Sequence, residues 1–398
     1  MAECGGRAWL TLALMSALYF IITAATFGSL GMVLPAMVKE LGWSWTGAGF
    51  GFSLLGFFCG ITSAVPAALI RRFGVRATLL AGCVVMGLAF ACLARTGGLL
   101  GYFAGASLAG LGFTLLDSVP ATYLLSRLFA RPSFAIGLFF TVGGLGGVAG
   151  PLLYTSVIDA TGNWRSYWLV VGMLIALIGA IAAFAVDARS DVGAAAQGDP
   201  EISTERWSFR DALQTPQFWT IAAAFVAFQF CGITASSVSV AHLTQHGVAA
   251  IVAGSMMSAE ALVNSSARFA GGILTRFVSA KTLLSASLAC LVVGMLALGV
   301  ARDLPMMLVY AVGIGIGYGL TLFAATILLL DYFGRGPYLE LFSAVNLIST
   351  VGAVAPTLAG LTRDRIGSFT PFFMGLAVLV TLVLLAVIMM RTPHPRRT

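Results

Sequence analysis

Long apolar segments recur along the whole chain and are separated by short polar stretches. Twelve runs of about 20 predominantly apolar residues lie at 9–38, 45–70, 76–94, 99–126, 134–157, 165–186, 217–241, 249–274, 281–301, 304–330, 337–362 and 369–390. A run of this length can cross a bilayer as a helix. The runs are at least twice as long as a barrel strand and lack strict alternation of polar and apolar residues. The pattern therefore predicts an all-α polytopic membrane protein with 12 transmembrane helices.

One long polar stretch, 187–216, interrupts this pattern in the middle of the chain. It divides the chain into an N-terminal six-helix bundle at 1–186, a linker at 187–216 and a C-terminal six-helix bundle at 217–398. The end of the linker, with Trp207 and Phe209, is compatible with a short amphipathic surface helix or with a flexible tether.

The two halves resemble each other when the chain is shifted by about 205 residues. The matched positions are Arg72-Phe73 with Arg276-Phe277, Gly112 with Gly317, Phe129-Ala130-Arg131 with Phe333-Gly334-Arg335, Pro151 with Pro356, Asp159 with Asp364, and Gly162 with Gly367. Parallel repeats related by an axis along the membrane normal are typical of transporters, which bind substrate near the midplane.

The distribution of charge predicts the orientation in the membrane. Only 9% of the residues are charged, against about 25% in soluble domains. If both termini are cytoplasmic, 15 of the 22 Lys and Arg residues fall on the cytoplasmic side, as the positive-inside rule requires. The net charge of +7 thus reflects membrane topology and does not indicate nucleic acid as a partner. We expect a multi-pass protein of the plasma membrane, specifically a bacterial inner membrane.

Arg268 is the one basic residue placed well inside an apolar run, 249–274, whereas Arg76, Arg165 and Lys281 each stand at the first position of a run. An arginine near the bilayer centre costs about 2.5–3.5 kcal/mol on insertion scales, and such residues usually serve function. Glu260 and Asn264 precede it at steps of four, which places all three on one helix face. A snorkelling side chain is the alternative, but Arg268 lies about 12 Å deeper than Arg276. A cation in this position predicts an anionic substrate, and the planar guanidinium suits a carboxylate because it donates two parallel hydrogen bonds.

Two acids are candidates for coupling or gating. Glu260 is positioned either to pair with Arg268 and exchange a proton during transport, or to face water in an outer vestibule. Asp117 is the one acid well inside an apolar run of the first half. It is either a coupling or substrate residue, or the partner of Arg127 or Arg131 in a cytoplasmic gate.

Uncharged polar residues complete the candidate site. Asn346 and Gln229 are amides at mid-span depth, and Tyr19, Tyr154, Tyr310 and Tyr318 offer hydroxyl groups. Each can contact substrate or serve in helix packing. His242 and His246 are expected in the outer loop after the seventh run, and the cysteines are expected to be reduced.

The loop after the second run carries a family resemblance. It reads Ala67-Ala68-Leu69-Ile70-Arg71-Arg72-Phe73-Gly74-Val75-Arg76. It resembles the Gly-x-x-x-Asp-Arg-x-Gly-x-Arg signature of the major facilitator superfamily at Arg72, Gly74 and Arg76. The resemblance implies a role in gating for Arg72 and Arg76. Arg71 replaces the aspartate of the family's usual charge lock. The resemblance implies the 6 + 6 helix fold, with the first, fourth, seventh and tenth helices lining the cavity.

Within that superfamily the chain resembles the monocarboxylate porter and oxalate/formate antiporter branch. The loop Arg127-Leu128-Phe129-Ala130-Arg131-Pro132-Ser133-Phe134-Ala135-Ile136-Gly137 is similar to a signature of this branch, and Glu3-Cys4-Gly5-Gly6-Arg7-Ala8-Trp9 is a weaker match. The resemblance implies that Arg268 holds the substrate carboxylate. Asn264 stands where proton-coupled members carry an aspartate, and the eleventh helix lacks the lysine that oxalate exchangers carry there. We therefore expect secondary active transport or exchange of monocarboxylates, by symport or antiport, with protons as possible co-substrates.

Two other functions fit the scaffold. Gly146-x-x-x-Gly150-Pro151 partly matches a fifth-helix signature of drug/proton antiporters, but Tyr154-Thr155 replaces the Gly-Gly that follows in that signature. A non-transporting membrane receptor or assembly factor is the third interpretation. The sequence shows no nucleophile–base pair, metal cluster or ATP motif, so we expect neither an enzyme nor a cofactor.

Overall fold

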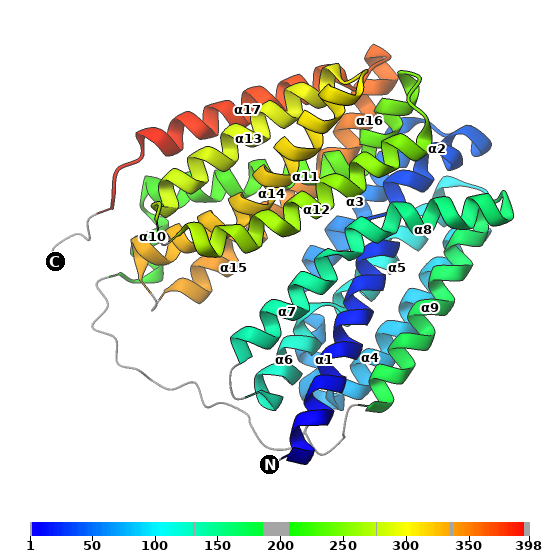
Figure 1. The fold of residues 1–398 in the computed structure, drawn as a ribbon, viewed down its shortest axis with the longest axis horizontal. Coiled ribbons are helices and arrows are strands. Elements are labelled where there is room, and N and C mark those ends of the chain that lie inside the picture. The colour runs from blue at the N-terminus through cyan, green and yellow to red at the C-terminus, as the bar shows by residue number, and fades with distance from the viewer. Residues whose placement is uncertain (1, 130–131, 186–206, 276, 335–336, 394–398) are drawn as a thin grey trace.

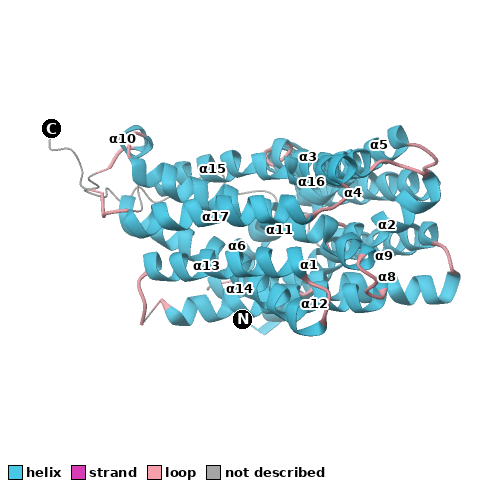
Figure 2. Ribbon diagram, turned by 90° about the horizontal axis from the view of Figure 1, so that it is seen from above, coloured by secondary structure: helices cyan, strands magenta, loops and turns pink. Residues whose placement is uncertain are grey.

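The computed structural model describes residues 2–129, 132–185, 207–275, 277–334 and 337–393. Throughout these ranges the regular structure is helical, and Figure 2 shows helices joined by short loops without a strand. Ten of the described helical segments are long and apolar enough to cross a membrane. The shorter α3 (Trp45–Ile61) and the more polar α12 (Ala250–Leu274) complete the predicted spans. The predicted fold class is confirmed.

The first half contains helices α1 to α9. They are α1 (Ala2–Ala25), α2 (Leu30–Leu41), α3, α4 (Val65–Arg95), α5 (Leu99–Leu116), α6 (Ser118–Leu128), α7 (Pro132–Gly144), α8 (Gly146–Thr161) and α9 (Trp164–Ala185). Three of the predicted runs are broken near their middle, so that α1 and α2, α5 and α6, and α7 and α8 each form one span. Such breaks free backbone groups and are tolerated where the protein or a cavity satisfies them.

The second half contains helices α10 to α17. They are α10 (Phe209–Leu213), α11 (Pro216–Gln245), α12, α13 (Ala280–Val300), α14 (Leu304–Phe333), α15 (Tyr338–Ser349), the 3-10 turn η2 (Thr350–Val354), α16 (Ala355–Ile366) and α17 (Thr370–Met389). The Ser208 hydroxyl caps α10, and Trp207 packs edge-on against Phe333 with ring centroids 5.4 Å apart. The end of the predicted linker is thus a short helix. Residues 187–206 of that linker lie outside the described residues.

Glycines with positive φ mark equivalent points of the two halves. Gly162 ends α8 with φ 66°, and Gly367 ends α16 with φ 83°, both in the left-handed conformation that favours glycine at a helix end. The 205-residue shift pairs these two positions. Gly74, in the loop signature, has φ 82° and breaks α4 at the turn between the second and third spans. The conformation of Gly74 explains why a glycine is needed there.

The two halves meet on the side of the molecule away from the start of α1 and the end of α17. Here α2 packs against α11, α3 against α16 and η2, and α8 against α12. Ser258 donates a hydrogen bond to the Val148 carbonyl at 2.8 Å, and the hydroxyls of Ser53 and Thr357 share one at 2.7 Å. Figure 1 shows the halves joined around α2, α3 and α16 and diverging toward α6, α7, α10 and α15. The halves are therefore in contact on one side, here called the closed side, and farther apart on the side where α1 begins, here called the open side.

The expected position of His242 was wrong. Helix α11 continues one turn beyond the predicted run, and His242 lies inside it, 1% exposed. Its ring packs against Phe373 with centroids 5.0 Å apart and against His246 at 4.4 Å. The aromatic start of α17 covers this turn, so a residue that resembles a loop histidine becomes part of the core.

Candidate functional site

A cavity of about 840 Å³ lies between the two halves near the middle of the spans. The candidate residues that line it are Tyr19, Asp117, Gln229, Glu260, Asn264, Arg268, Tyr318 and Asn346. Helices of the first, fourth, seventh and tenth spans contribute, as the family resemblance implied. The second, fifth, eighth and eleventh spans contribute as well, through residues such as Cys59, Gly147, Arg268 and Ala353. The cavity walls thus come from both halves.

Arg268 projects from α12 into this cavity. Its guanidinium carbon lies 5.8 Å from the centroid of the Tyr318 ring, within reach of a cation–π interaction. The Tyr318 hydroxyl in turn donates a hydrogen bond to Gln229 Oε1 at 3.0 Å, which fixes the ring beneath the cation. Among the described residues Arg268 makes no ion pair, and its buried Nε has no hydrogen-bond partner. A cation that is positioned but unpaired is well suited to receive an anion.

The polar face of α12 enters the cavity as the spacing of four predicted. Asn264 and Glu260 line the cavity above Arg268, and Asn264 Oδ1 is buried without a partner among the described residues. Glu260 is only 6% exposed, so it does not face an open outer vestibule. Its backbone carbonyl packs against Gly315 of α14, where a Cβ would clash. Glu260 is therefore a largely enclosed lining residue of the cavity, within electrostatic reach of Tyr310.

Asp117 occupies the break between α5 and α6. Its backbone has φ −77° and ψ −148°, which is not helical, and this break turns the carboxyl toward the cavity. Oδ2 accepts a hydrogen bond from the Ser118 hydroxyl at 3.1 Å, whereas the buried Oδ1 has no partner among the described residues. The acid belongs to the first half, whereas Arg268 belongs to the second.

Tyr19 of α1 lines the same cavity as these two charges. It is within electrostatic reach of both Asp117 and Arg268. Its ring stacks on Phe139 with centroids 4.8 Å apart and packs so closely on Gly143 that a Cβ there would overlap it. The hydroxyl makes no hydrogen bond to any described residue, which leaves it available to a ligand.

The remaining candidates divide by position. Asn346 lines the cavity and donates one amide N–H to the Phe342 carbonyl at 2.9 Å, so its second N–H and its side-chain oxygen remain available to a ligand. Tyr154 is not among the residues that line the cavity, because it packs against Tyr167 with ring centroids 5.5 Å apart in the core between α8 and α9. This position does not support its predicted contact with substrate. Tyr310 is fully buried near Glu260 and is likewise not a lining residue.

The four basic residues predicted to act in gating lie away from the cavity or outside the description. Arg72 stacks over Phe73 at 5.2 Å, and Arg76 over the Phe184 ring at 4.4 Å, both on the open side of the molecule. The side chain of Arg127 and the whole of Arg131 lie outside the described residues. The expected pairing of Asp117 with either residue stays a prediction.

Sequence reasoning missed several small polar lining residues, including Thr23, Ser63, Ser236, Ser265 and Thr350. Serine and threonine occur on every face of membrane helices, where they bond to the carbonyl one turn earlier, as Ser265 does to Ala261. Only the rotation of each helix about its axis distinguishes a lining hydroxyl from a packed one. That rotation is set by the neighbouring helices.

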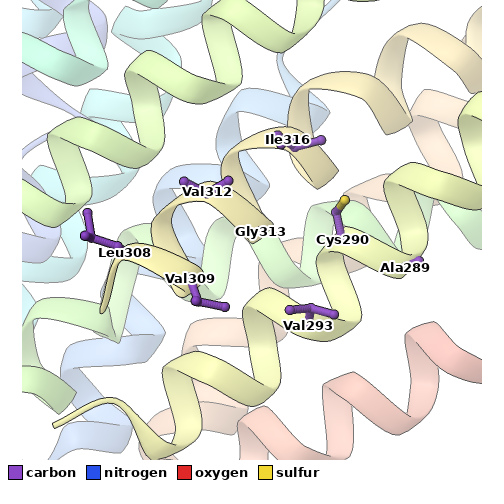
Figure 3. Close-up of a pocket in the computed structure, with 8 residues that line it drawn as sticks. All are labelled: Ala289, Cys290, Val293, Leu308, Val309, Val312, Gly313 and Ile316. Atoms are coloured by element: carbon purple, nitrogen blue, oxygen red, sulfur yellow. The ribbon is translucent and has the colours of Figure 1, made fainter. Parts of the chain in front are cut away.

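A second hollow of about 470 Å³ lies between α13 and α14 on the outer surface. Figure 3 shows its lining residues, among them Cys290, Val293 and Val312 around Gly313. Val293 and Val312 are about half exposed, at 51% and 44%. The described residues that line it are apolar apart from Cys290 and carry no charged group that could hold an anion.

The helical fold and the central cavity are compatible with a membrane transporter, and the comparison with protein families identifies the superfamily. The family model described as Major Facilitator Superfamily matches residues 15–337, so the chain belongs to this superfamily of transporters and not to a family of enzymes. A relative in Escherichia coli (strain K12), "Uncharacterized MFS-type transporter YhjX", is 23% identical over 341 residues, covering 82% of this chain and 80% of its own.

Solved structures share the fold at low sequence identity. A mutant form of the nucleoside transporter NupG superposes with TM-score 0.74 at 11% identity, covering 96% of this chain and 99% of its own. A POT family transporter in complex with a thioalcohol-conjugated peptide gives 0.76 at 13%, covering 95% of each chain. A bacterial homolog of the human lysosomal transporter Spinster, in an inward-facing and unoccupied conformation, gives 0.69 at 15%, covering 96% and 94%. At such identities the likeness concerns the fold alone.

Proposed function

We propose that this chain transports small organic anions, specifically monocarboxylates, by alternating access. One observation carries the proposal. The guanidinium of Arg268 lies in a cavity built by both halves and has no ionic partner among the described residues. An isolated buried charge is costly, and a bound carboxylate would offset that cost through two parallel hydrogen bonds. The substrate would thereby complete a charge pair that the protein leaves open.

A single cation favours a single carboxylate. The eleventh span presents Asn346 to the cavity, where an amide can donate to an oxygen but cannot balance a second negative charge. Arg268, Asn264, Asn346, Gln229, Tyr19 and Tyr318 are the proposed substrate-binding residues. Gln229 acts mainly by holding the Tyr318 hydroxyl, because its side-chain oxygen already accepts that hydrogen bond.

The proposed orientation places both termini in the cytoplasm of a bacterial cell, with 1–186 and 217–398 as the two moving bundles and 187–216 as the cytoplasmic linker. The balance of Lys and Arg in the loops supports this topology. The side on which the halves diverge is then the cytoplasmic side, and the structure represents an inward-open state. Arg72, Arg76, Arg127 and Arg131 would lie at the cytoplasmic rim, where they would act in closing the gate.

Coupling to protons, if present, would require a titratable acid in the cavity. Asn264 does not titrate, which leaves Glu260 and Asp117. Glu260 has the better position because it shares a helix face with Arg268, so a change in its protonation would alter the field at the arginine. A carrier without such coupling would be a uniporter or an anion exchanger.

A drug/proton antiporter of the same superfamily is the second candidate. Aromatic rings in the cavity, including Phe27, Phe113 and Phe342, favour it because they could bind lipophilic compounds. The glycine signature of the fifth helix supports it less, since Gly146 and Gly150 serve to bring α8 against the backbone of the first span at Phe20 and Ala24.

Counterflow in proteoliposomes distinguishes the two candidates. Purified protein would be loaded with unlabelled compound and offered labelled monocarboxylates, dicarboxylates and cationic dyes. We expect exchange of monocarboxylates above the level of empty liposomes. Counterflow of dyes without counterflow of any carboxylate would reject the anion proposal in favour of drug export.

A further inference from the structure

We infer that the substrate carries a hydrogen-bond donor, such as a hydroxyl or ammonium group, in addition to its carboxylate, and that Asp117 accepts from this donor. The inference rests on the proposed function and deepens it, because it names the second functional group that the site selects. A small hydroxy acid or amino acid is then the expected class of substrate, in preference to a plain carboxylic acid.

The first observation is the unsatisfied acceptor of Asp117. The carboxyl is buried at a break in the fourth span, and only one of its two oxygens is used, by the neighbouring Ser118. The other oxygen has no partner among the described residues and is enclosed by protein in this state, at the edge of the cavity that the residue lines. A buried acceptor that lacks a donor is destabilising and rare in proteins, so a ligand that supplies the donor gains binding energy from this oxygen.

The second observation is that Asp117 and Arg268 face one cavity from different halves of the protein. Both are described residues, and they form no ion pair with each other in this state. Tyr19 lies within electrostatic reach of both and lines the same space. The two charges are therefore two separate groups on one cavity, and the inference assigns the negative end of the substrate to Arg268 and its donor end to Asp117.

Glu260 is a weaker candidate for this role. It belongs to the same helix as Arg268 and lies two turns, about 12 Å, along that helix toward the closed end. A ligand that joined Glu260 to Arg268 would contact one half only. A ligand that joined Asp117 to Arg268 would connect the halves, and the energy of this connection would favour the movement that encloses the substrate.

Because Arg268 binds a carboxylate and Asp117 requires a hydrogen-bond donor, the site should discriminate between acids that carry such a donor and acids that lack it. A plain acid would satisfy Arg268 but leave Asp117 without a donor in a desolvated site. Sites built to hydrogen-bond a hydroxyl or amine reject analogues that lack it more strongly than apolar pockets reject a missing methylene. One hydrogen bond to a charged acceptor corresponds to a preference of about 10- to 100-fold in affinity.

The experiment measures binding of a series of three-carbon acids to the purified full-length protein in nanodiscs by calorimetry. The series is propionate, lactate, 3-hydroxypropionate and β-alanine. In the wild-type protein at least one donor-bearing acid should bind about tenfold or more tightly than propionate. Asp117→Asn should reduce this preference to less than about threefold, with the affinity for propionate unchanged or higher. Asp159→Asn removes an exposed acid of the same half outside the cavity, and should preserve the preference.

The wild-type series decides the inference even if Asp117→Asn fails to fold. Equal affinities for propionate and all three donor-bearing acids would overturn it and leave the monocarboxylate proposal intact. A loss of affinity in Asp117→Asn that is the same for every acid would assign Asp117 a structural role and would also overturn it. Failure of the wild-type protein to bind any of the four acids would instead reject the proposed function, and the inference with it.

Discussion

Asp364 of the second half closes one face of the protein by capping a helix of the first half. Its Oδ1 accepts from the Trp45 backbone N–H at 3.0 Å, and its Oδ2 accepts from the Thr46 N–H at 2.7 Å and from the Thr46 hydroxyl. Trp45 and Thr46 form the first turn of α3, where N–H groups lack partners within the helix. The carboxylate also interacts favourably with the positive end of the helix dipole. The closed face is thus held by a helix cap that crosses between the halves.

Alternating access requires this cap to break whenever the face opens. Ser44 still caps α3 through its bond from the Gly47 N–H when this contact breaks, so only the bonds from Trp45 and Thr46 are lost. Because Asp364 is exposed, we take their contribution as about 1 kcal/mol. We expect Asp364→Ala to stabilise the open face relative to the closed one by about 1 kcal/mol. This corresponds to about a fivefold change in the ratio of the two states. Substrate-independent opening of this face should therefore become detectable.

Spin–spin distance measurements can detect the opening. Labels at Ala160 in α8 and Ile366 in α16 report from the same face on the two halves, in a background whose native cysteines are replaced by alanine. We expect a larger fraction of long distances in Asp364→Ala than in the unmodified protein. Asp303→Ala is the matched control, because Asp303 caps α14 within the second half by accepting from the Met306 N–H at 3.0 Å. Identical distance distributions in Asp364→Ala and the unmodified protein, or equal opening in Asp303→Ala, would refute the assignment.

Three further predictions address the site and the fold. In Glu260→Gln, uptake should lose its dependence on pH between about 5.5 and 7.5, because the variant lacks the titratable group. Exchange of substrate for substrate should persist. Unchanged pH dependence of uptake would assign proton coupling to another residue. In Tyr318→Phe, loss of the hydrogen bond to Gln229 should weaken carboxylate binding, measured by calorimetry, by about three- to tenfold, since a neutral hydrogen bond is worth about 1 kcal/mol. Tyr310 does not line the cavity, so Tyr310→Phe should retain the affinity. Gly367→Ala should lower thermal stability by about 1 kcal/mol, because φ of 83° strains a residue with a Cβ. Gly375→Ala, with open space around the added carbon, is its control, and equal melting temperatures for the two variants would argue against the strain.

The sequence predicts the fold well because bilayer spans are long and their apolar runs are local features. The stripe of Glu260, Asn264 and Arg268 follows from helical spacing alone, and all three residues line the cavity. The matched pair Gly162 and Gly367 marks the shared ends of α8 and α16. The breaks within spans were not predicted, since they depend on how neighbouring helices satisfy the freed backbone groups.

Positions that depend on helix rotation or on distant contacts escaped prediction. Tyr154 lies in a span that borders the cavity, yet it faces Tyr167 in the core. His242 is covered by Phe373, which belongs to the last helix of the chain. The bond from Thr46 to Asp364 joins residues 318 positions apart, and the repeat that pairs Asp159 with Asp364 gave no indication of it. Such features arise from tertiary packing, which a single sequence does not encode locally.

Direct binding of a labelled monocarboxylate to the unmodified protein, Arg268→Lys and Arg268→Ala is the measurement that tests the central claim. We expect Arg268→Lys to lose most of the affinity, because an ammonium cannot replace the two parallel hydrogen bonds of the guanidinium. Arg268→Ala should bind no carboxylate while it still inserts and elutes as a folded protein. Arg302→Ala, which removes an exposed basic residue outside the cavity, should bind normally. Unchanged carboxylate binding by folded Arg268→Ala would contradict the account.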